Sequence, residues 1–238
     1  MRQVPSYLII GRGRVAAHMK HYFTLLGLPF SHWHRGQFHQ ALCQKIADAS
    51  HVLLLISDDA IIPFLAKEPL LRQKICIHFS ASTCSDDAYL AHPLMSFPVT
   101  LYDLKTYQNI PFVVDKGVRL TDILPGLDNP CAEIVPQMRE YYHSLCVMAQ
   151  NFTTLLWQKA YSDFSEKLGI EKNILKPILQ QTMENLLSHP DKALTGPLSR
   201  GDQNTILKHL KALTGDPYYE VYQAFLKAYK KTNHKEKK

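Results

Sequence analysis

The feature that most constrains the fold of this chain is a glycine-containing turn between a short apolar run and a helical pattern, Gly11-Arg12-Gly13-Arg14-Val15-Ala16. Residues 7–10 predict a buried strand, and the apolar spacing over residues 15–26 predicts a helix. In such a strand–turn–helix unit, Gly11 permits the tight turn, Gly13 lets the backbone approach a diphosphate, and Ala16 lets helix and strand pack closely. We therefore expect residues 11–16 to contact a dinucleotide; the alternative is a glycine turn in an unliganded fold of this type.

Short apolar runs alternate with helical patterns throughout the first half of the chain. The predicted strands are residues 7–10, 28–33, 51–56, 75–79 and 112–114, with helices between them. Strands that alternate with helices indicate a parallel sheet, and cover on both faces explains their continuous apolar character. Only helical patterns follow Pro130. The sequence predicts an α/β Rossmann parallel sheet in residues 1–130, an all-α helical domain in residues 131–230, and a basic, disordered tail in residues 231–238.

The second predicted strand ends in a window that bears on cofactor choice, Ser31-His32-Trp33-His34-Arg35. In folds that bind NAD, an acidic residue in this window bonds the ribose 2′-hydroxyl. None is present here. Arg35, helped by Ser31 and His34, can instead neutralise and hydrogen-bond a 2′-phosphate. The window therefore favours NADP as the cofactor over NAD.

Further polar residues follow the third and fourth predicted strands, at the carboxyl edge where an open α/β sheet binds its ligands. Ser57 and Asp58 either cap the next helix or contact the cofactor. His78 and Ser80 are further candidates for cofactor contact. Asp58 and Asp59 have no neighbouring His or Cys cluster in the sequence, so we expect no metal site.

The helix predicted for residues 137–168 carries no formally charged residue between Glu140 and Lys159. Its apolar residues share one face, and the opposite face is polar but neutral, with His143, Gln150, Asn151, Thr154 and Gln158. This pattern indicates a helix covered on both sides, whose polar face lines a cleft or an interface. The alternative is a solvent-facing surface that merely lacks charge.

Hydride transfer to a carbonyl or imine needs a proton donor, and imidazole suits that task near neutral pH. His78, His92 and His143 are the candidates, of which we favour His143, with Asn151 orienting the substrate. Other candidate substrate contacts are His92, Thr154 and Arg200. Arg200 lies in a glycine-rich and proline-containing segment that is equally consistent with a structural turn.

Together these motifs resemble a family of Rossmann-like oxidoreductases with a C-terminal domain of unknown function, related to ketopantoate reductase, pyrroline-5-carboxylate reductase and deazaflavin-dependent NADP oxidoreductases. The resemblance spans nearly the whole chain, and its most specific strings are residues 92–97, His-Pro-Leu-Met-Ser-Phe, and residues 194–202, Leu-Thr-Gly-Pro-Leu-Ser-Arg-Gly-Asp. It implies an NADP-binding domain, a helical domain like that of the 6-phosphogluconate dehydrogenase superfamily, and dimerisation through the helices. Related hydroxyacid dehydrogenases place a proton-donating lysine one turn before the asparagine, where this chain has Val147.

Composition limits the remaining possibilities. The five cysteines are scattered and read as reduced thiols, and no secretory or membrane-spanning stretch is evident, so a cytoplasmic protein without membrane contact is expected. The net charge of +6 draws on a lysine-rich tail whose nucleic-acid-binding interpretation we do not favour. The leading hypothesis is an NADP-dependent, homodimeric reductase of a small carbonyl or imine compound. Its alternative is a non-catalytic NADP(H)-binding sensor or regulator.

Overall fold

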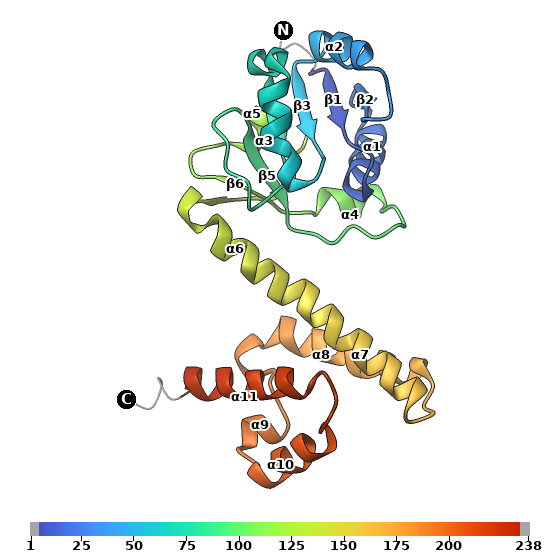
Figure 1. Cartoon of the computed structure of the whole chain (residues 1–238), viewed down its shortest axis with the longest axis vertical. Coiled ribbons are helices and arrows are strands. Elements are labelled where there is room, and N and C mark those ends of the chain that lie inside the picture. The colour runs from blue at the N-terminus through green and yellow to red at the C-terminus, as the bar shows by residue number, and fades with distance from the viewer. Residues whose placement is uncertain (1–4, 234–238) are drawn as a thin grey trace. The chain divides into compact units, whose positions relative to one another are not determined.

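The computed structural model describes residues 5–233, which divide into two compact units after Trp157. The first unit is built around a seven-stranded sheet with the strand order β2-β1-β3-β4-β5-β6-β7 (Figure 1). Its strands are β1 (Tyr7–Ile10), β2 (Phe30–Trp33), β3 (His51–Leu54), β4 (Ile75–His78), β5 (Tyr89–Pro93), β6 (Phe112–Asp115) and β7 (Cys131–Ile134). The predicted α/β Rossmann sheet followed by a helical region is confirmed.

One edge of the sheet differs from the prediction of an all-parallel arrangement. β5 and β6 are antiparallel, whereas every other neighbouring pair is parallel. Between β5 and β6 the chain forms only the short helix α4 (Leu104–Gln108), which lies at the end of the sheet where β5 finishes (Figure 1). This connection does not cross back over the sheet. β6 therefore starts at the same end of the sheet and runs in the opposite direction to β5.

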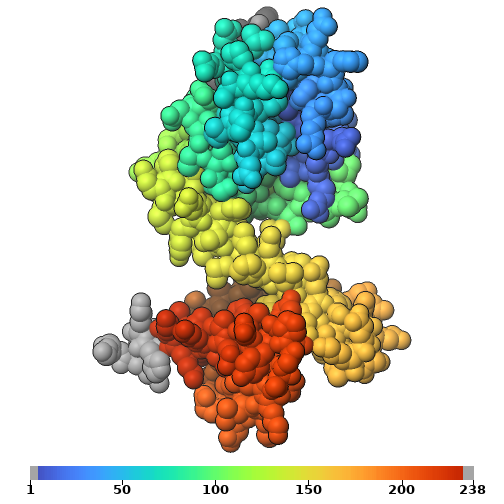
Figure 2. Space-filling model, viewed as in Figure 1, coloured from blue at the N-terminus to red at the C-terminus, as the bar shows by residue number. Residues whose placement is uncertain are grey.

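Helices cover both faces of the sheet, as the continuous apolar strands predict. They are α1 (Arg14–Leu26), α2 (His39–Asp48), α3 (Asp58–Lys67), η1 (Pro69–Gln73), α4 and α5 (Leu120–Ile123). Alternate β1 side chains enter two separate cores, with Ile9 in the cluster that includes α1 and Ile10 in the cluster that includes α2 and α3. On the face that carries α3, the atoms of the first unit form a closed surface over the strands (Figure 2). The strands β1, β3 and β4 are accordingly almost entirely buried.

The predicted long helix is present and contains an irregular turn. After η2 (Pro136–Met138), the helix runs through α6 (Arg139–Cys146), the π-helical segment η3 (Val147–Phe152) and α7 (Thr153–Glu166). It ends before Gly169, whose φ of 66° is the left-handed conformation that commonly follows a helix. Single π-helical turns inside α-helices occur frequently at functional sites, and this one includes Asn151.

The second unit is entirely helical and has a very small core. It contains the rest of α7, η4 (Lys172–Ile174), α8 (Leu175–Ser188), η5 (Pro190–Lys192), α9 (Pro197–Arg200), α10 (Gln203–Ala212) and α11 (Tyr219–Asn233). Asp202 caps α10, because its carboxylate accepts a hydrogen bond from the Thr205 amide at 3.0 Å. Among described residues after Trp157, the buried apolar side chains are Leu175 and Ile206.

The C-terminal end of the chain is more helical than its composition indicates. α11 continues to Asn233, so the first residues of the predicted disordered tail are helical; residues 234–238 of that tail lie outside the described residues. Lys230 and Lys231 lie in the last turn of α11, where positive charge interacts favourably with the helix dipole. No helix within residues 5–233 has the length and apolar character needed to cross a membrane.

Candidate functional site

Gly11 at the end of β1 is required by the structure itself. Its φ is 138°, and a Cβ at this position would lie 2.1 Å from the carbonyl oxygen of Leu55. The Gly11 amide donates a hydrogen bond to the Trp33 carbonyl at 2.9 Å, which ties the turn to the end of β2. A side chain at Gly11 would therefore displace the end of β3, which Leu55 follows.

Gly13 is different, because the protein places no steric demand on it. It is the N-cap residue of α1 with an ordinary φ of −72°, and an added Cβ would meet no described atom within 4 Å. No side chain caps α1, and its first turn carries no acidic residue. The helix N-terminus therefore offers backbone N–H groups and a positive dipole beside open space, the arrangement that fits a phosphate group.

The other predicted residues of the turn divide into exposed and buried ones. Arg12 and Arg14 are exposed, and Val15 is half-buried. Ala16 is fully buried in the core between α1 and the sheet, where a larger side chain would separate the two. The close helix–strand packing that the sequence predicts at Ala16 is therefore seen.

The window after β2 places its three predicted residues near the surface. Ser31 lies in β2 and is half-buried, and Arg35 is exposed. His34 accepts a hydrogen bond at Nδ1 from the Gly36 amide at 3.1 Å, which shapes the turn that presents Arg35. The arrangement leaves a cationic side chain beside the end of β2, where an open sheet of this kind receives the ribose of a dinucleotide.

His32 is a residue of this window that the sequence interpretation missed. Its Nε2 contacts the Gly11 carbonyl at 2.5 Å, and burial is the main reason that its pKa lies below the usual value. His32 is therefore neutral at pH 7 and donates from Nε2, which fixes the glycine turn. No sequence pattern indicated this contact. It depends on the parallel pairing of β2 with β1, which places His32 beside Ile9.

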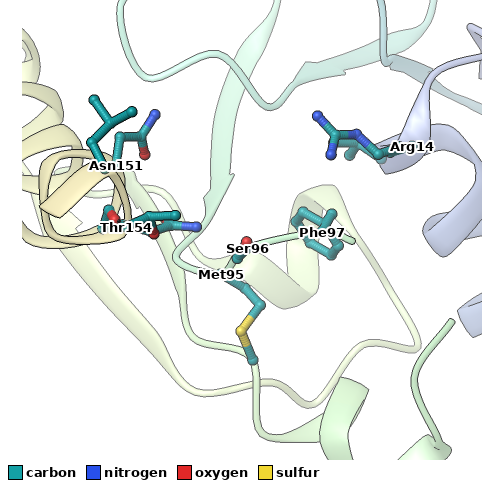
Figure 3. Close-up of a pocket in the computed structure, with 9 residues that line it drawn as sticks. Arg14, Met95, Ser96, Phe97, Asn151 and Thr154 are labelled. Carbon is teal, nitrogen blue, oxygen red and sulfur yellow. Dashed lines mark hydrogen bonds between the residues drawn. The ribbon is translucent and has the colours of Figure 1, made fainter. Parts of the chain in front are cut away.

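A groove of about 540 Å³ joins the glycine turn to the long helix (Figure 3). Its lining comes from the turn, the loop after β5 and the long helix: Arg14, Val15, Met95, Ser96, Phe97, Gln150, Asn151, Thr154 and Leu155. Arg14 lies across the space from Asn151 and Thr154, with the loop after β5 between them (Figure 3). Gln150, Asn151 and Thr154 of the predicted polar face line this groove, whereas His143 and Gln158 do not. The opposite face of the helix is exposed at Met148 and Phe152, so the predicted cover on both sides is not seen in the single chain. The loop residues Met95 and Ser96 are an addition.

The loop that contributes Phe97 is held from behind by the fully buried His18 of α1. Tyr107 accepts a hydrogen bond at its hydroxyl from the Tyr102 amide and lies 2.8 Å from Nδ1 of His18. Nε2 of His18 lies 2.8 Å from the Pro98 carbonyl, an acceptor, so Nε2 carries the proton and Nδ1 accepts from Tyr107. With both ring nitrogens engaged, His18 fixes the loop against α1.

His143 and His92, both predicted at the site, lie beside one another, with ring centroids 6.1 Å apart. Burial and the neighbouring His143 lower the pKa of His92 to about 4, so His92 is neutral at pH 7. Its Nδ1 lies 2.7 Å from the hydroxyl of Tyr142, which can donate to it. The side chains that line the groove among the described residues include Asn151 but neither histidine.

The residues predicted after β3 and β4 have structural partners. Ser57 occupies the N-cap position of α3, but its side chain makes no capping bond. Asp58 instead accepts a hydrogen bond from the Ser82 hydroxyl at 3.1 Å, and it lies in the first turn of α3, where a carboxylate complements the dipole. The Ser80 hydroxyl lies 2.8 Å from that of Thr83. None of these residues lines the groove.

Arg139 is a buried cation that the sequence interpretation missed. It is the first residue of α6, is 4% exposed, and forms a two-pronged ion pair with Asp115, with its Nε donating at 2.8 Å. Its Nη1 donates to the Thr83 carbonyl at 2.5 Å. A cation this buried needs such partners, and together they attach the start of the long helix to the sheet.

His78 at the end of β4 is fully buried, with neither ring nitrogen in a geometric hydrogen bond among the described residues. Burial, followed by the nearby Arg139 guanidinium, lowers its pKa to about 4, although Asp115 and Asp58 act in the opposite direction. His78 is therefore a neutral core residue at pH 7. This position does not suit it to serve as a proton donor.

The buried imidazole of His78 gives an expected dependence of stability on pH. The unfolded chain takes up this proton below about pH 6.5, whereas the folded chain does so only near pH 4. Stability should therefore be complete above pH 6.5 and fall as the pH drops from 6.5 towards 4, by about 3 kcal/mol from this residue. Urea unfolding at several pH values should show a shallower fall for His78→Leu; an unchanged slope would contradict the assignment.

Arg200 lies in the second unit. It is exposed at the end of α9, between Gly196 and Gly201, whose φ angles of 92° and 69° shape the turn on either side. The structural interpretation of this segment is therefore supported, and a substrate contact by Arg200 stays a prediction.

Comparisons with known proteins agree with this architecture. Residues 117–229 match a family model described as a domain of unknown function, DUF2520, which is somewhat less than half of the chain. No curated protein matches the chain. The predicted resemblance to Rossmann-like oxidoreductases with a C-terminal domain of unknown function is confirmed by this match together with the similar solved structures.

Three of these solved structures illustrate the similarity. A Bacteroides fragilis protein described as an NADP oxidoreductase is 20% identical with a TM-score of 0.75, and the match covers 94% of this chain and 97% of the other. An imine reductase of Streptomyces aurantiacus is 14% identical with a TM-score of 0.67, covering 95% and 93%. Pyrroline carboxylate reductase of Plasmodium falciparum, solved with NADP bound, is 12% identical with a TM-score of 0.56, covering 94% and 96%.

Proposed function

We propose that this chain is an NADP-dependent reductase of a small carbonyl or imine compound. The observation that carries the proposal is the groove, which starts at the uncapped N-terminus of α1 and ends at Asn151 and Thr154. A dinucleotide whose diphosphate lies at Gly13 would extend its nicotinamide along the carboxyl edge of the sheet towards these side chains. The described neighbours, which include an imine reductase, support this reaction class.

The residues proposed to hold the cofactor divide by function. Backbone amides of residues 11–16 bind the diphosphate, and Arg12 and Arg14 add positive charge beside it. Arg35, with Ser31 and His34, binds the 2′-phosphate and selects NADP over NAD. The other predicted cofactor contacts are Ser57, Asp58, His78 and Ser80. We propose that they shape the loops that approach the cofactor at this end of the sheet, and that buried His78 does so by packing.

The proposed chemistry divides between cofactor and protein. NADPH supplies the hydride when bound, and the protein must supply a proton to the reduced oxygen or nitrogen. We propose Asn151 and Thr154, which line the groove, as substrate contacts, with Asn151 orienting the substrate. His143 is the proposed proton donor and His92 a further contact; these two histidines lie beside one another and must reach the substrate from outside the groove lining. Since Val147 replaces the lysine of related enzymes, the donor in this chain must be a different group.

NADPH oxidation measured across a panel of small carbonyl and imine compounds tests this function. Turnover with at least one compound is expected, and His143→Ala should lower kcat by about 100-fold or more, the usual range for a general acid. His189→Ala, which changes an exposed histidine of the second unit, is the matched control. Saturable NADPH binding without turnover of any compound would instead support the non-catalytic sensor.

We also propose that the chain is a homodimer that associates through its helices. The second unit buries only two apolar side chains among its described residues, too few for a stable core, and exposes many large ones. The exposed set is Leu168, Ile174, Ile178, Met183, Leu186, Leu187, Leu194, Leu207, Val221 and Phe225. A second copy of the chain would cover this surface.

Light scattering measures the molar mass in solution and so tests the proposed dimer directly. The wild-type chain should have twice its monomer mass of 27.2 kDa. The double variant Met183→Asp/Leu187→Asp places two charges four residues apart on one exposed apolar face of α8 and should weaken association by about 100-fold or more. Gln181→Asp, an exposed polar site on the same helix, is the control. A monomeric wild-type chain at micromolar concentration would contradict the proposal.

A further inference from the structure

Three side chains that ligate metals meet outside the groove, at the end of the sheet from which β1 and β3 start. His39 is the first residue of α2, and Cys43 follows one turn later on the same face. Glu68 lies between α3 and η1, and α2 lies at the same end of the sheet as η1 (Figure 1). One ligand atom from each residue lies within 4.8 Å of the other two.

The contacts within this cluster are short. Nε2 of His39 lies 2.8 and 3.0 Å from the two carboxylate oxygens of Glu68, and Nδ1 lies 3.7 Å from Sγ of Cys43. The His39 ring therefore lies between a thiol and a carboxylate.

Burial is distributed unevenly over the three residues. The Glu68 side chain is only 5% exposed, whereas that of His39 is 59% exposed. A buried carboxylate is costly unless a positive group compensates it. A divalent cation would compensate the carboxylate and a thiolate together, because the two negative charges equal its own.

We propose that His39, Cys43 and Glu68 form a binding site for a divalent transition metal of the zinc class. Zinc accepts this mixture of sulfur, nitrogen and oxygen ligands, with bond lengths of about 2.0 to 2.3 Å. In tetrahedral geometry these bond lengths place ligand atoms roughly 3.3 to 3.7 Å apart. The 3.7 Å between His39 Nδ1 and Cys43 Sγ already fits, whereas the Glu68 oxygens contact Nε2 on the other side of the ring. The imidazole and the carboxylate must therefore turn for all three side chains to reach one metal ion.

The remaining coordination position faces solvent, because His39 is the exposed member of the set. Water would fill this fourth position, as in zinc sites with three protein ligands. On binding, the metal–sulfur bond replaces the S–H bond of Cys43, and the proton passes to the buffer. The affinity for the metal should therefore rise with pH, because fewer protons compete with the metal for the sulfur.

Cobalt(II) titration of the reduced, full-length protein tests the site without any assay of activity. One equivalent of cobalt should bind with a thiolate-to-metal charge-transfer absorption, and zinc should displace it. Cys43→Ser should abolish this absorption, and His39→Gln should weaken binding by about 100-fold or more, since loss of even an outer-shell partner costs about 10- to 100-fold. Both variants change partly or largely exposed side chains, and thermal melting checks that they fold.

Cysteines elsewhere in the first unit supply the matched control. Cys84 and Cys131 are exposed and lie outside the cluster, so Cys84→Ser and Cys131→Ser should leave the cobalt spectrum unchanged. The proposal is overturned if the wild-type protein gives no charge-transfer band at stoichiometric cobalt. It is equally overturned if folded Cys43→Ser keeps the band, because the thiolate would then come from another cysteine. In either case the contact between His39 and Glu68 is a hydrogen bond that needs no metal.

Discussion

Gly13→Asp is expected to abolish NADPH binding while leaving the chain folded. An Asp side chain fits sterically, because Gly13 has an ordinary φ and open space beside it. Its carboxylate would, however, occupy the position proposed for the diphosphate. Two like charges about 4 Å apart cost about 4 kcal/mol at the effective dielectric of a protein surface, which corresponds to roughly a thousandfold loss of affinity.

Isothermal titration calorimetry measures this loss, and thermal melting shows whether the variant remains folded. Thr24→Asp adds the same charge at an exposed position near the other end of α1 and should bind NADPH like the wild-type chain. If Gly13→Asp is folded and keeps its affinity for NADPH, the diphosphate does not lie at this helix N-terminus.

Gly11→Ala is expected to lower the folding stability of the chain, in contrast to Gly13→Asp, which should lose NADPH binding but stay folded. The new Cβ would lie 2.1 Å from a backbone oxygen, and the φ of 138° is one that residues other than glycine rarely adopt. Either the end of β3, which Leu55 follows, or β1 must shift, and both are interior strands of the sheet. We expect a loss of about 4 kcal/mol or more, the exceptional range for a single substitution.

Urea unfolding of Gly11→Ala and Gly13→Ala provides a matched pair. The same methyl group is added two residues apart, and only the first meets a neighbouring atom. Gly13→Ala should unfold within about 1 kcal/mol of the wild-type chain. Equal stability of both variants would show that the turn does not approach Leu55 as described.

Local features of this fold could be predicted from the sequence. The turn at Gly11 follows directly from a strand pattern, a glycine pair and a helix pattern, all within twenty residues. The cap at Asp202 likewise depends only on its neighbour Thr205. The strands β1, β3 and β4 are largely apolar because both of their faces are buried, which makes them visible without tertiary information.

Other features depend on tertiary contacts and could not be predicted. β5 contains His92 and Pro93 and was not recognised as a strand, and β7 is largely exposed and lacks an apolar run. The reversed direction of β6 follows from the path of the chain after β5, which no local pattern encodes.

The candidate site shows the same division. Asn151 and Thr154 could be predicted because the long helix lacks charge over its central turns. Met95 and Ser96 reach the groove only because a loop folds back against buried His18. The ion pair between Arg139 and Asp115 joins residues 24 positions apart, and neither position has a sequence signal for its partner.

Calorimetric titration of the wild-type chain with NADPH and with NADH tests the central claim most directly. The account predicts saturable binding of NADPH at one site per chain, with NADH bound at least about tenfold more weakly because Arg35 faces a 2′-hydroxyl in place of a phosphate. Absence of binding heat with either nucleotide over a range of temperatures would contradict it.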